Sequence, residues 1–230
     1  MKKYAKALLL ILCAVLLVAG SVLGTLAFLT SEDRVENTFS TGHVKITLDE
    51  APVDKTGKTV TGDRVKKNDY HLLPGHEYVK DPTVHVVKDS EDCYVRMFVT
   101  VNQSSQWNAI CDGHKDAQGK KQFDILDIFQ GLSSDWTMLE PKEDLAGTNT
   151  RTYEFRYKEK VTDVPETADK DLPALFTGLK MPDQLTNEDM EKLGDDFRIW
   201  VVAQAIQEDG FASAEEAFDP AVLALPSLMP

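Results

Sequence analysis

The stretch GTLAFLTSEDRVENTFSTGHVKITL, residues 24–48, joins an apolar N-terminal segment to the first predicted β-strand. Upstream of it, residues 7–23 are apolar or small throughout and follow a short basic head. A basic head, an apolar middle and an exit of small residues are typical of a secretory signal peptide. At the other end of the stretch, apolar Val44, Ile46 and Leu48 alternate with polar residues, which is the pattern of a half-buried strand. The chain is therefore expected to be exported and to begin its folded part as β structure.

We predict that residues 1–27 are the signal peptide. Thr25 and Ala27 supply small residues at the −3 and −1 positions, so cleavage is expected after Ala27 and Phe28 becomes the first mature residue. The alternative is an uncleaved anchor, because no charge occurs from residue 7 to residue 29 and about 20 apolar residues can span a bilayer. The small residues at the exit favour cleavage.

The same stretch resembles the start of proteins exported through the SipW-type signal peptidase, the family that includes the TasA fibre proteins of biofilms and the camelysin-like proteins. Further stretches resemble this family in the same order along the chain. They are LLPGHEYVKDPTVHV from Leu72, CYVRMFVTV from Cys93, LFTGLKMP from Leu175 and IWVVAQAIQEDGFASAEEAF from Ile199. The resemblance implies a jelly-roll-like fold, processing by a SipW-type peptidase, and a structural role at the cell surface or in an extracellular matrix.

Alternating and apolar runs predict a mainly β, antiparallel sandwich over residues 43–230, with short helices in the connections. Strands are expected over residues 44–49, 78–87 with a break near Pro82, 93–101, 135–140, 151–161 and 197–206. Helices are expected over residues 123–132, 186–193 and 214–218, the second with Thr186 as N-cap and Asp189 at N3, the third with a capping box of Ser213 and Glu216. Residues 51–68 are expected to be a loop or a flexible hairpin, and residues 102–121 to be turn-rich. The strand over 93–101 is apolar almost throughout, which predicts a central strand covered on both faces.

Charge limits the partners of the protein. The chain has 25 basic and 38 acidic residues, a formal net charge of −13; loss of residues 1–27 removes three lysines and no acid, which gives 22 − 38 = −16. Such a surface repels phosphate backbones, so nucleic acid is not an expected partner. The expected partners are the signal peptidase and then other copies of the chain or related fibre subunits, with membrane contact only before processing.

Two cysteines, Cys93 and Cys111, remain after the signal peptide is removed. A disulfide between them would contribute roughly 3 kcal/mol in the chain-entropy model. The alternative is two small, buried, unbonded side chains. The sequence leaves both open.

No catalytic constellation emerges from the sequence. HExxH, the zinc motif expected of a camelysin-type metalloprotease, does not occur, and the nearest approach, His71-Leu-Leu-Pro-Gly-His76, contains a turn signal that breaks a helix. Asp112, Gly113, His114 and Asp116 lack the spacing of an EF-hand and are predicted to form a solvated loop. The aromatic residues Tyr153, Phe155 and Tyr157 are expected to pack in the core rather than bind a ligand. Neither a cofactor nor a metal site is expected.

Residues 28–42 are predicted to be an extension that adds as a strand to a neighbouring subunit after cleavage, with Phe28, Val35 and Phe39 as its apolar anchors. This reading rests mainly on the resemblance to the TasA family. The alternative is that this segment packs on its own domain. The sequence thus favours a secreted, fibre-forming structural protein; a surface metalloprotease and a membrane-tethered adhesin or ligand-binding module are the alternatives.

Overall fold

The chain divides into two units, residues 1–41 and residues 42–230. The structure, a computed structural model, describes residues 4–6, 8, 10–18, 42–139 and 147–220. In the first unit the described residues are helical. None of the helices in the described part of the chain has both the length and the apolar character that crossing a membrane would require.

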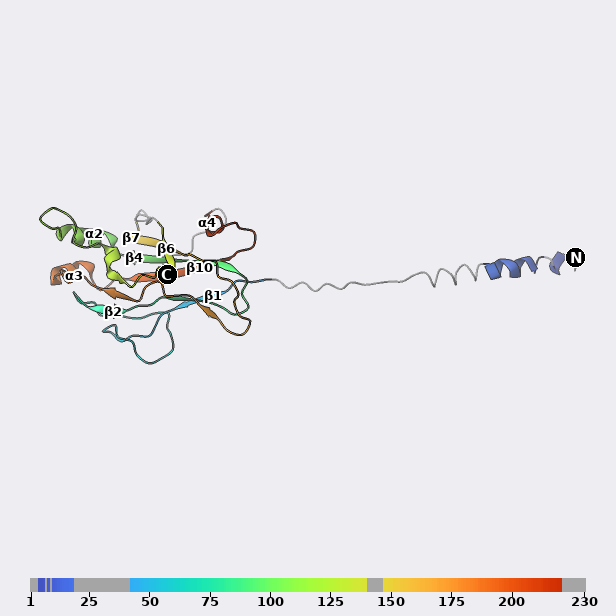
Figure 1. Cartoon of the computed structure of the whole chain (residues 1–230), viewed down its shortest axis with the longest axis horizontal. Coiled ribbons are helices and arrows are strands. Elements are labelled where there is room, and N and C mark those ends of the chain that lie inside the picture. Colours follow the sequence, from blue (N-terminus) through green and yellow to red (C-terminus); the bar gives the residue numbers. More distant parts are fainter. Residues whose placement is uncertain (1–3, 7, 9, 19–41, 140–146, 221–230) are drawn as a thin grey trace. The chain divides into compact units, whose positions relative to one another are not determined.

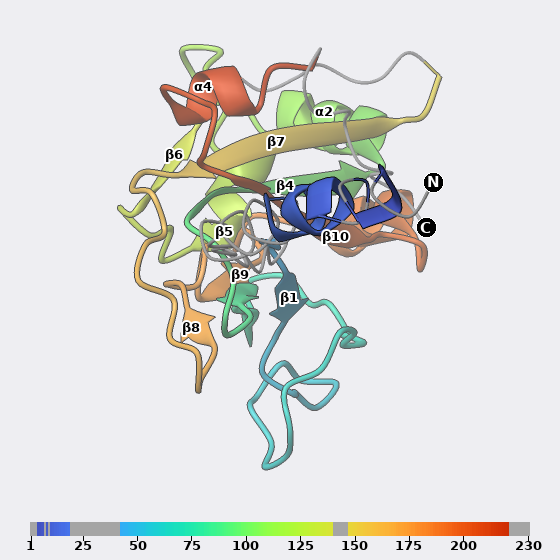
Figure 2. The same cartoon turned by 90° about the vertical axis from the view of Figure 1, so that its right-hand side faces the viewer.

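The second unit is built from antiparallel strands in two layers (Figures 1 and 2). One layer is a four-stranded sheet in the order β10-β4-β7-β6. Its strands are β10 (Ile199–Gln207), β4 (Cys93–Asn102), β7 (Thr150–Tyr157) and β6 (Trp136–Met138). The other layer holds two three-stranded sheets. These are β1 (Ile46–Asp49), β3 (Thr83–Val86) and β8 (Lys170–Asp171), and β2 (Glu77–Val79), β9 (Gly178–Lys180) and β5 (Phe129–Gln130). The prediction of a mainly β, antiparallel fold is confirmed.

The core lies against one face of the four-stranded sheet. On β4 the side chains that face it are Val95, Met97, Val99 and Val101, which are at most 1% exposed. Tyr153 and Phe155 of β7 pair with Val99 and Met97 and join the same core, as predicted. Because residues on the opposite face of β4, such as Phe98, are buried as well, the prediction of a central strand covered on both faces is confirmed.

The predicted helix over 186–193 is confirmed as α3 (Asn187–Leu193). Thr186 is its N-cap and accepts a hydrogen bond from the backbone of Asp189, whose carboxylate bonds back to the backbone of Thr186. The helix over 214–218 is present as α4 (Ala214–Ala217), but here Glu216 accepts from the backbone of Ala212 and only the Ser213 half of the capping box forms.

Two local predictions were wrong. Residues 102–121 were expected to be turn-rich but contain α2 (Ser104–Gly113), which buries Trp107, Ile110 and Cys111 at helical spacing against the core. The expected helix over 123–132 is one short 3₁₀ turn, η1 (Ile125–Ile128), after which β5 begins. Tertiary pairing overrides the helical spacing there, because Phe129 pairs with Leu179 of β9.

Residues 51–76, which we call the lobe, leave the end of β1 and return at β2. Its cyan trace extends away from the four-stranded sheet in Figure 2. Two isolated antiparallel bridges, Glu50 with Val65 and Val53 with Thr59, shape the lobe, in agreement with the prediction of a loop or flexible hairpin over residues 51–68. Gly57 allows the lobe to pack closely against β2. The φ of Gly57 is 78°, and a Cβ on this residue would lie 2.4 Å from the ring of Tyr78.

Candidate functional site

The residues predicted for processing and strand donation lie outside the described residues. Thr25, Ala27 and Phe28 of the cleavage site belong to this group, as do the further anchors Val35 and Phe39. Cleavage after Ala27 and strand donation by residues 28–42 therefore stay predictions. The structure does describe the strands that end each sheet, beside which another strand could add.

One such edge is the β10 side of the four-stranded sheet. Along the described chain β10 ends this sheet, and it pairs with β4 at every position from Ile199 to Gln207. Eight of its nine residues are neither fully buried nor fully exposed. Edge strands are commonly protected from further pairing by charged side chains or proline. The β10 sequence, IWVVAQAIQ, contains neither, so its chemistry suits the addition of another strand.

The inward face of β10 carries residues of graded size. Ile199 and Val201 are large, whereas Ala203 and Ala205 are small, and all four are partly buried residues packed against the core. A strand that adds beside β10 places alternate side chains next to this row. The two alanines leave the most room for a large apolar side chain of a neighbouring strand.

On the opposite face of β10, the side chain of Gln204 binds a buried arginine, Arg96. Arg96 of β4 is 1% exposed and donates to the side chain of Gln204 at 3.0 and 2.7 Å. Its guanidinium carbon lies 4.6 Å from the ring centroid of Phe218, which follows α4. Arg96 also lies 3.4 Å from the carboxylate of Glu154 on β7. This arginine thus connects β10, β4, β7 and the end of α4.

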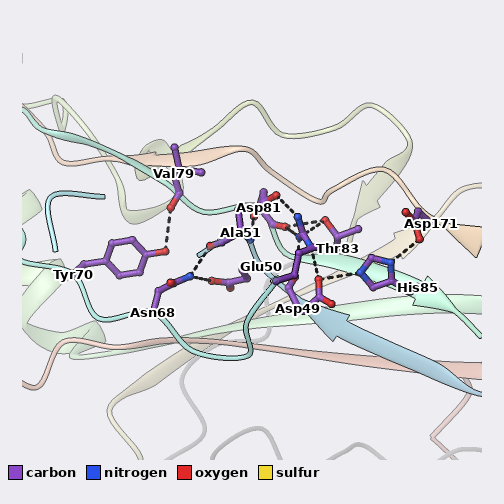
Figure 3. Close-up of polar contacts among 11 residues, drawn as sticks. Asp49, Glu50, Ala51, Asn68, Tyr70, Val79, Asp81, Thr83, His85 and Asp171 are labelled. Carbon is purple, nitrogen blue, oxygen red and sulfur yellow. Dashed lines mark hydrogen bonds and ion pairs between the residues drawn. The ribbon is translucent and has the colours of Figure 1, made fainter. Parts of the chain in front are cut away.

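The second layer carries a polar cluster that spans three strands (Figure 3). His85 of β3 lies between two carboxylates: its Nδ1 is 2.6 Å from Asp171 of β8, and its Nε2 is 2.9 Å from Asp49 of β1. Arg64 of the lobe binds the carboxylates of Asp49 and Asp81. The cluster therefore joins β1, β3, β8 and the lobe.

Electrostatics in this cluster favour the charged forms. Burial opposes the charge of His85, but its hydrogen bonds and charge interactions with Asp171 and Asp49 outweigh burial and raise the pKa of the imidazole. Burial likewise opposes the charge of Asp49, yet hydrogen bonds from Arg64 and His85 lower the pKa of that carboxyl. No signal in the sequence pointed to this cluster, because its members come from three strands and from the connections around them and share no spacing.

The histidines considered for metal binding are not assembled into a site. His71 and His76 are both exposed on the loop that precedes β2. Within the described ranges there is no group of three or more His, Cys, Asp or Glu side chains arranged to hold a metal ion.

The expectation of a solvated loop at Asp112, Gly113, His114 and Asp116 was wrong in part. Asp112 and Gly113 belong to the last turn of α2, and the ring of His114 is 2.9 Å from the carboxylate of Asp189, which joins α2 to α3. Asp116 is exposed in the turn beyond.

Cys93 and Cys111 are buried and unbonded in the structure, so the disulfide alternative is not formed and the alternative of two small buried side chains applies. The physical reason is the length of β4. Nine residues of strand separate Cys93 from Asn102 by about 30 Å, and the chain from there to Cys111 covers at most about 17 Å. The two Cα atoms are thus more than about 7 Å apart, beyond the reach of a disulfide. Burial raises the pKa of each thiol to about 11, which disfavours the reactive thiolate.

Comparison of the chain with protein-family models, with curated proteins and with solved structures gives no match.

Proposed function

We propose that the protein is an exported structural protein of the cell surface or biofilm matrix that forms fibres by donation of its N-terminal segment to a neighbouring copy. The observation that supports this most directly is β10: a nine-residue strand that ends its sheet in the described chain and carries neither charge nor proline. Main-chain hydrogen bonds to such a strand give affinity, and pockets for alternate side chains give register.

The finer fold assignment belongs to the same proposal. A jelly-roll-like arrangement is supported by the antiparallel strands in two layers and by the resemblance of the sequence to the TasA and camelysin-like family. Secretion through a SipW-type peptidase is supported by the basic head, the apolar segment and the small-residue exit before Phe28.

Donation in this arrangement is head-to-tail. The segment that donates, residues 28–42, and the strand that accepts, β10, are different surfaces of the chain, so each copy can donate to one neighbour and accept from another. Heterologous contacts that do not close into a ring extend into filaments. Burial of one Phe side chain contributes about 1.5–3 kcal/mol, so two or three apolar anchors outweigh any one surface ion pair.

The test combines both partners of the contact. Mature protein that starts at Phe28 should form filaments visible by electron microscopy, and deletion of residues 28–36 should leave a folded, soluble monomer. Val202→Lys places a charge on β10 and should also stop assembly. Thr137→Lys, on β6 at the opposite edge of the same sheet, is the matched control and should assemble normally.

If the deletion variant polymerises like the full mature chain, strand donation by this segment is refuted. If Thr137→Lys blocks filaments while Val202→Lys does not, the accepting edge is β6 and the assignment of β10 fails. Chelator-sensitive cleavage of peptides by the purified protein would support a metalloprotease instead, and an intact Met1 in surface-exposed protein would support a tethered module.

A further inference from the structure

A buried amine, a carboxylate and a carboxamide meet at the base of the lobe. Lys80 and Glu50, at 7% and 9% exposure, form an ion pair through Oε1 of the carboxylate. The other carboxylate oxygen, Oε2, accepts a hydrogen bond of 3.4 Å from Nδ2 of Asn68 (Figure 3). The Glu50 carboxylate thus binds a potential nucleophile, the amine of Lys80, through one oxygen and a potential acyl donor, the carboxamide of Asn68, through the other.

The backbone fixes the positions of these side chains. Glu50 follows β1 and forms two backbone hydrogen bonds of 2.8 Å with Val65, one in each direction. The next residue, Ala51, donates to the carboxylate of Asp81 at 2.6 Å, which lies directly after Lys80. The chain segments that carry Glu50 and Lys80 are therefore held against each other where the lobe leaves and rejoins the sheets.

The carboxamide of Asn68 is held in one orientation. Its Oδ1 accepts from the backbone N–H of Val53 at 3.1 Å, and its Nδ2 donates to the carbonyl of Ala51 at 3.0 Å. The Val53 N–H points at the oxygen on which negative charge would develop if a nucleophile added to Cγ. A donor placed in this way is the arrangement that stabilises a tetrahedral intermediate in acyl transfer.

Tyr70 covers the same region without competing for protons. Its hydroxyl donates to the carbonyl of Val79 at 3.0 Å (Figure 3). Burial, and after it the charge of Glu50, raises the pKa of Tyr70 well above the ordinary phenol value, so the hydroxyl keeps its proton. Glu50 is thus the group positioned to exchange protons with Lys80 and Asn68.

We propose that Lys80 and Asn68 form an intramolecular isopeptide bond, with Glu50 as the proton-transfer group. First, the Lys80 ammonium gives one proton to Glu50, which leaves a neutral amine. The amine attacks Cγ of Asn68, so a C–N bond forms and the C=O π electrons move to Oδ1, beside the Val53 N–H. Proton exchange through Glu50 follows: Nδ2 receives a proton and Nζ loses one.

The intermediate then collapses. The electron pair on Oδ1 restores the carbonyl, the Cγ–Nδ2 bond breaks, and one ammonia leaves. The products are an amide between Nζ and Cγ, ammonia, and one proton that stays on Glu50 or departs with ammonia as ammonium. Atoms and charge balance without any oxidant, cofactor or second enzyme.

The bond would close residues 68–80, the last part of the lobe together with β2, into a covalent ring. It links residue 68 of the lobe to residue 80, directly after β2, and it replaces a buried ammonium by a neutral amide. A buried ion pair is weakly stabilising because both charges lose their hydration. The amide removes that cost while its N–H can still donate to Glu50.

Mass spectrometry tests the proposal on the full mature chain. The intact mass is expected to fall short of the sequence mass by one ammonia. Trypsin cleaves after Lys67 and normally after Lys80, so the unlinked protein releases the peptide 68–80. Because an acylated lysine is not cleaved, the linked protein should instead give the peptide 68–88, with the ammonia deficit and no fragment ions from inside the 68–80 ring.

Wild-type protein decides the question by itself. A full sequence mass after prolonged incubation overturns the proposal. A deficit of one ammonia with normal cleavage after Lys80 also overturns it, because this result indicates a succinimide at Asn68 without participation of the lysine.

The variants assign the roles. Lys80→Met and Asn68→Ala should have the full sequence mass, whereas Lys55→Met, an exposed lysine of the same lobe, should still lose ammonia. Glu50→Gln should remain unlinked while circular dichroism shows a native spectrum. A link that forms in folded Glu50→Gln would overturn the role of Glu50 in proton transfer.

Discussion

Both ring nitrogens of His85 face carboxylate oxygens, and this geometry makes part of the folding stability depend on pH. A protonated imidazole has two N–H donors and can bind Asp171 and Asp49 at once, whereas a neutral imidazole has one donor and one lone pair. The lone pair would then face a carboxylate at 2.6 or 2.9 Å. We therefore predict that His85→Gln destabilises the protein at mildly acidic pH and has little effect at alkaline pH.

The sign follows from the raised pKa of His85. A histidine whose folded-state pKa lies above its unfolded value of about 6.5 contributes its full stability below that unfolded value. The contribution is lost as the pH rises through the higher, folded-state pKa. The carboxylates of Asp49 and Asp171 must stay ionised throughout, so the comparison belongs above the range in which carboxyls titrate.

The structure sets the size of the effect. The contact with Asp49 joins two largely buried groups and should contribute about 1.5–2 kcal/mol as a charge-assisted hydrogen bond. The side chain of Asp171 is 70% exposed, and water screens that pair to less than about 1 kcal/mol. His85→Gln should therefore lower the free energy of unfolding by about 2 kcal/mol near pH 6, and by at most about 0.5 kcal/mol near pH 9.5.

Urea unfolding of wild type and variant at both pH values measures this difference. Subtraction of the variant from the wild type cancels the other titrating groups. Asp171→Asn is the matched control, because it removes the exposed partner and should cost less than His85→Gln at the acidic pH. A destabilisation by His85→Gln that is equal at both pH values would refute the reasoning.

Three further predictions concern other parts of the chain. Arg96→Ala should lower the free energy of unfolding by about 3 kcal/mol, because it disrupts a buried ion pair, whereas Arg198→Ala at an exposed pair should change it by less than about 0.5 kcal/mol; urea midpoints test both. Ala27→Glu should block processing and keep the protein in the membrane fraction, and N-terminal sequencing of secreted wild type should begin at Phe28. His71→Ala and His76→Ala should not alter peptide hydrolysis in the presence of zinc, since we expect none in the wild type.

The strands were largely predictable because their patterns reflect burial directly. The run from Cys93 to Val101 is apolar at nearly every position, and the structure places it at the centre of a sheet with both faces covered. The N-cap of α3 could be predicted as well, because Thr186 and Asp189, which form it, are only three positions apart in the sequence. Such features depend on residues that are close together in the sequence, so the sequence pattern alone predicts them.

What could not be predicted depends on residues that meet across long sequence separations. The cluster around His85 combines Asp49, Arg64 and Asp171, and the Glu50 carboxylate meets Asn68 and Lys80. No spacing rule connects these positions, since strand pairing and the path of the lobe together bring them close. α2 was missed for a different reason: Gln103, in a left-handed conformation, begins it without a side-chain cap, so the usual start signal is absent.

Backbone pairing is more extensive within one layer of the second unit than within the other, and this difference determines how tension would act on the proposed fibre. β4 pairs with β10 at nine positions and with β7 at seven, around an apolar core. β3 pairs with β1 at four positions and with β8 at two, so side-chain contacts must supply more of the stability of that sheet.

In the proposed fibre, residues 28–42 are held by one subunit and continue along the chain into β1 of the next. A pull on the fibre therefore reaches β1, in the sheet with the shorter pairing, before it reaches β4. Asp49, the last residue of β1, is where His85 and Arg64 bind, and Glu50 follows it beside Lys80. The ionic cluster around Asp49 and the Glu50 side chain of the proposed link thus lie at the C-terminal end of β1, the strand that receives the tension. In such a fibre the side-chain contacts of Asp49 would add to the four-residue pairing of β1, which by itself would be the first part of the domain to open.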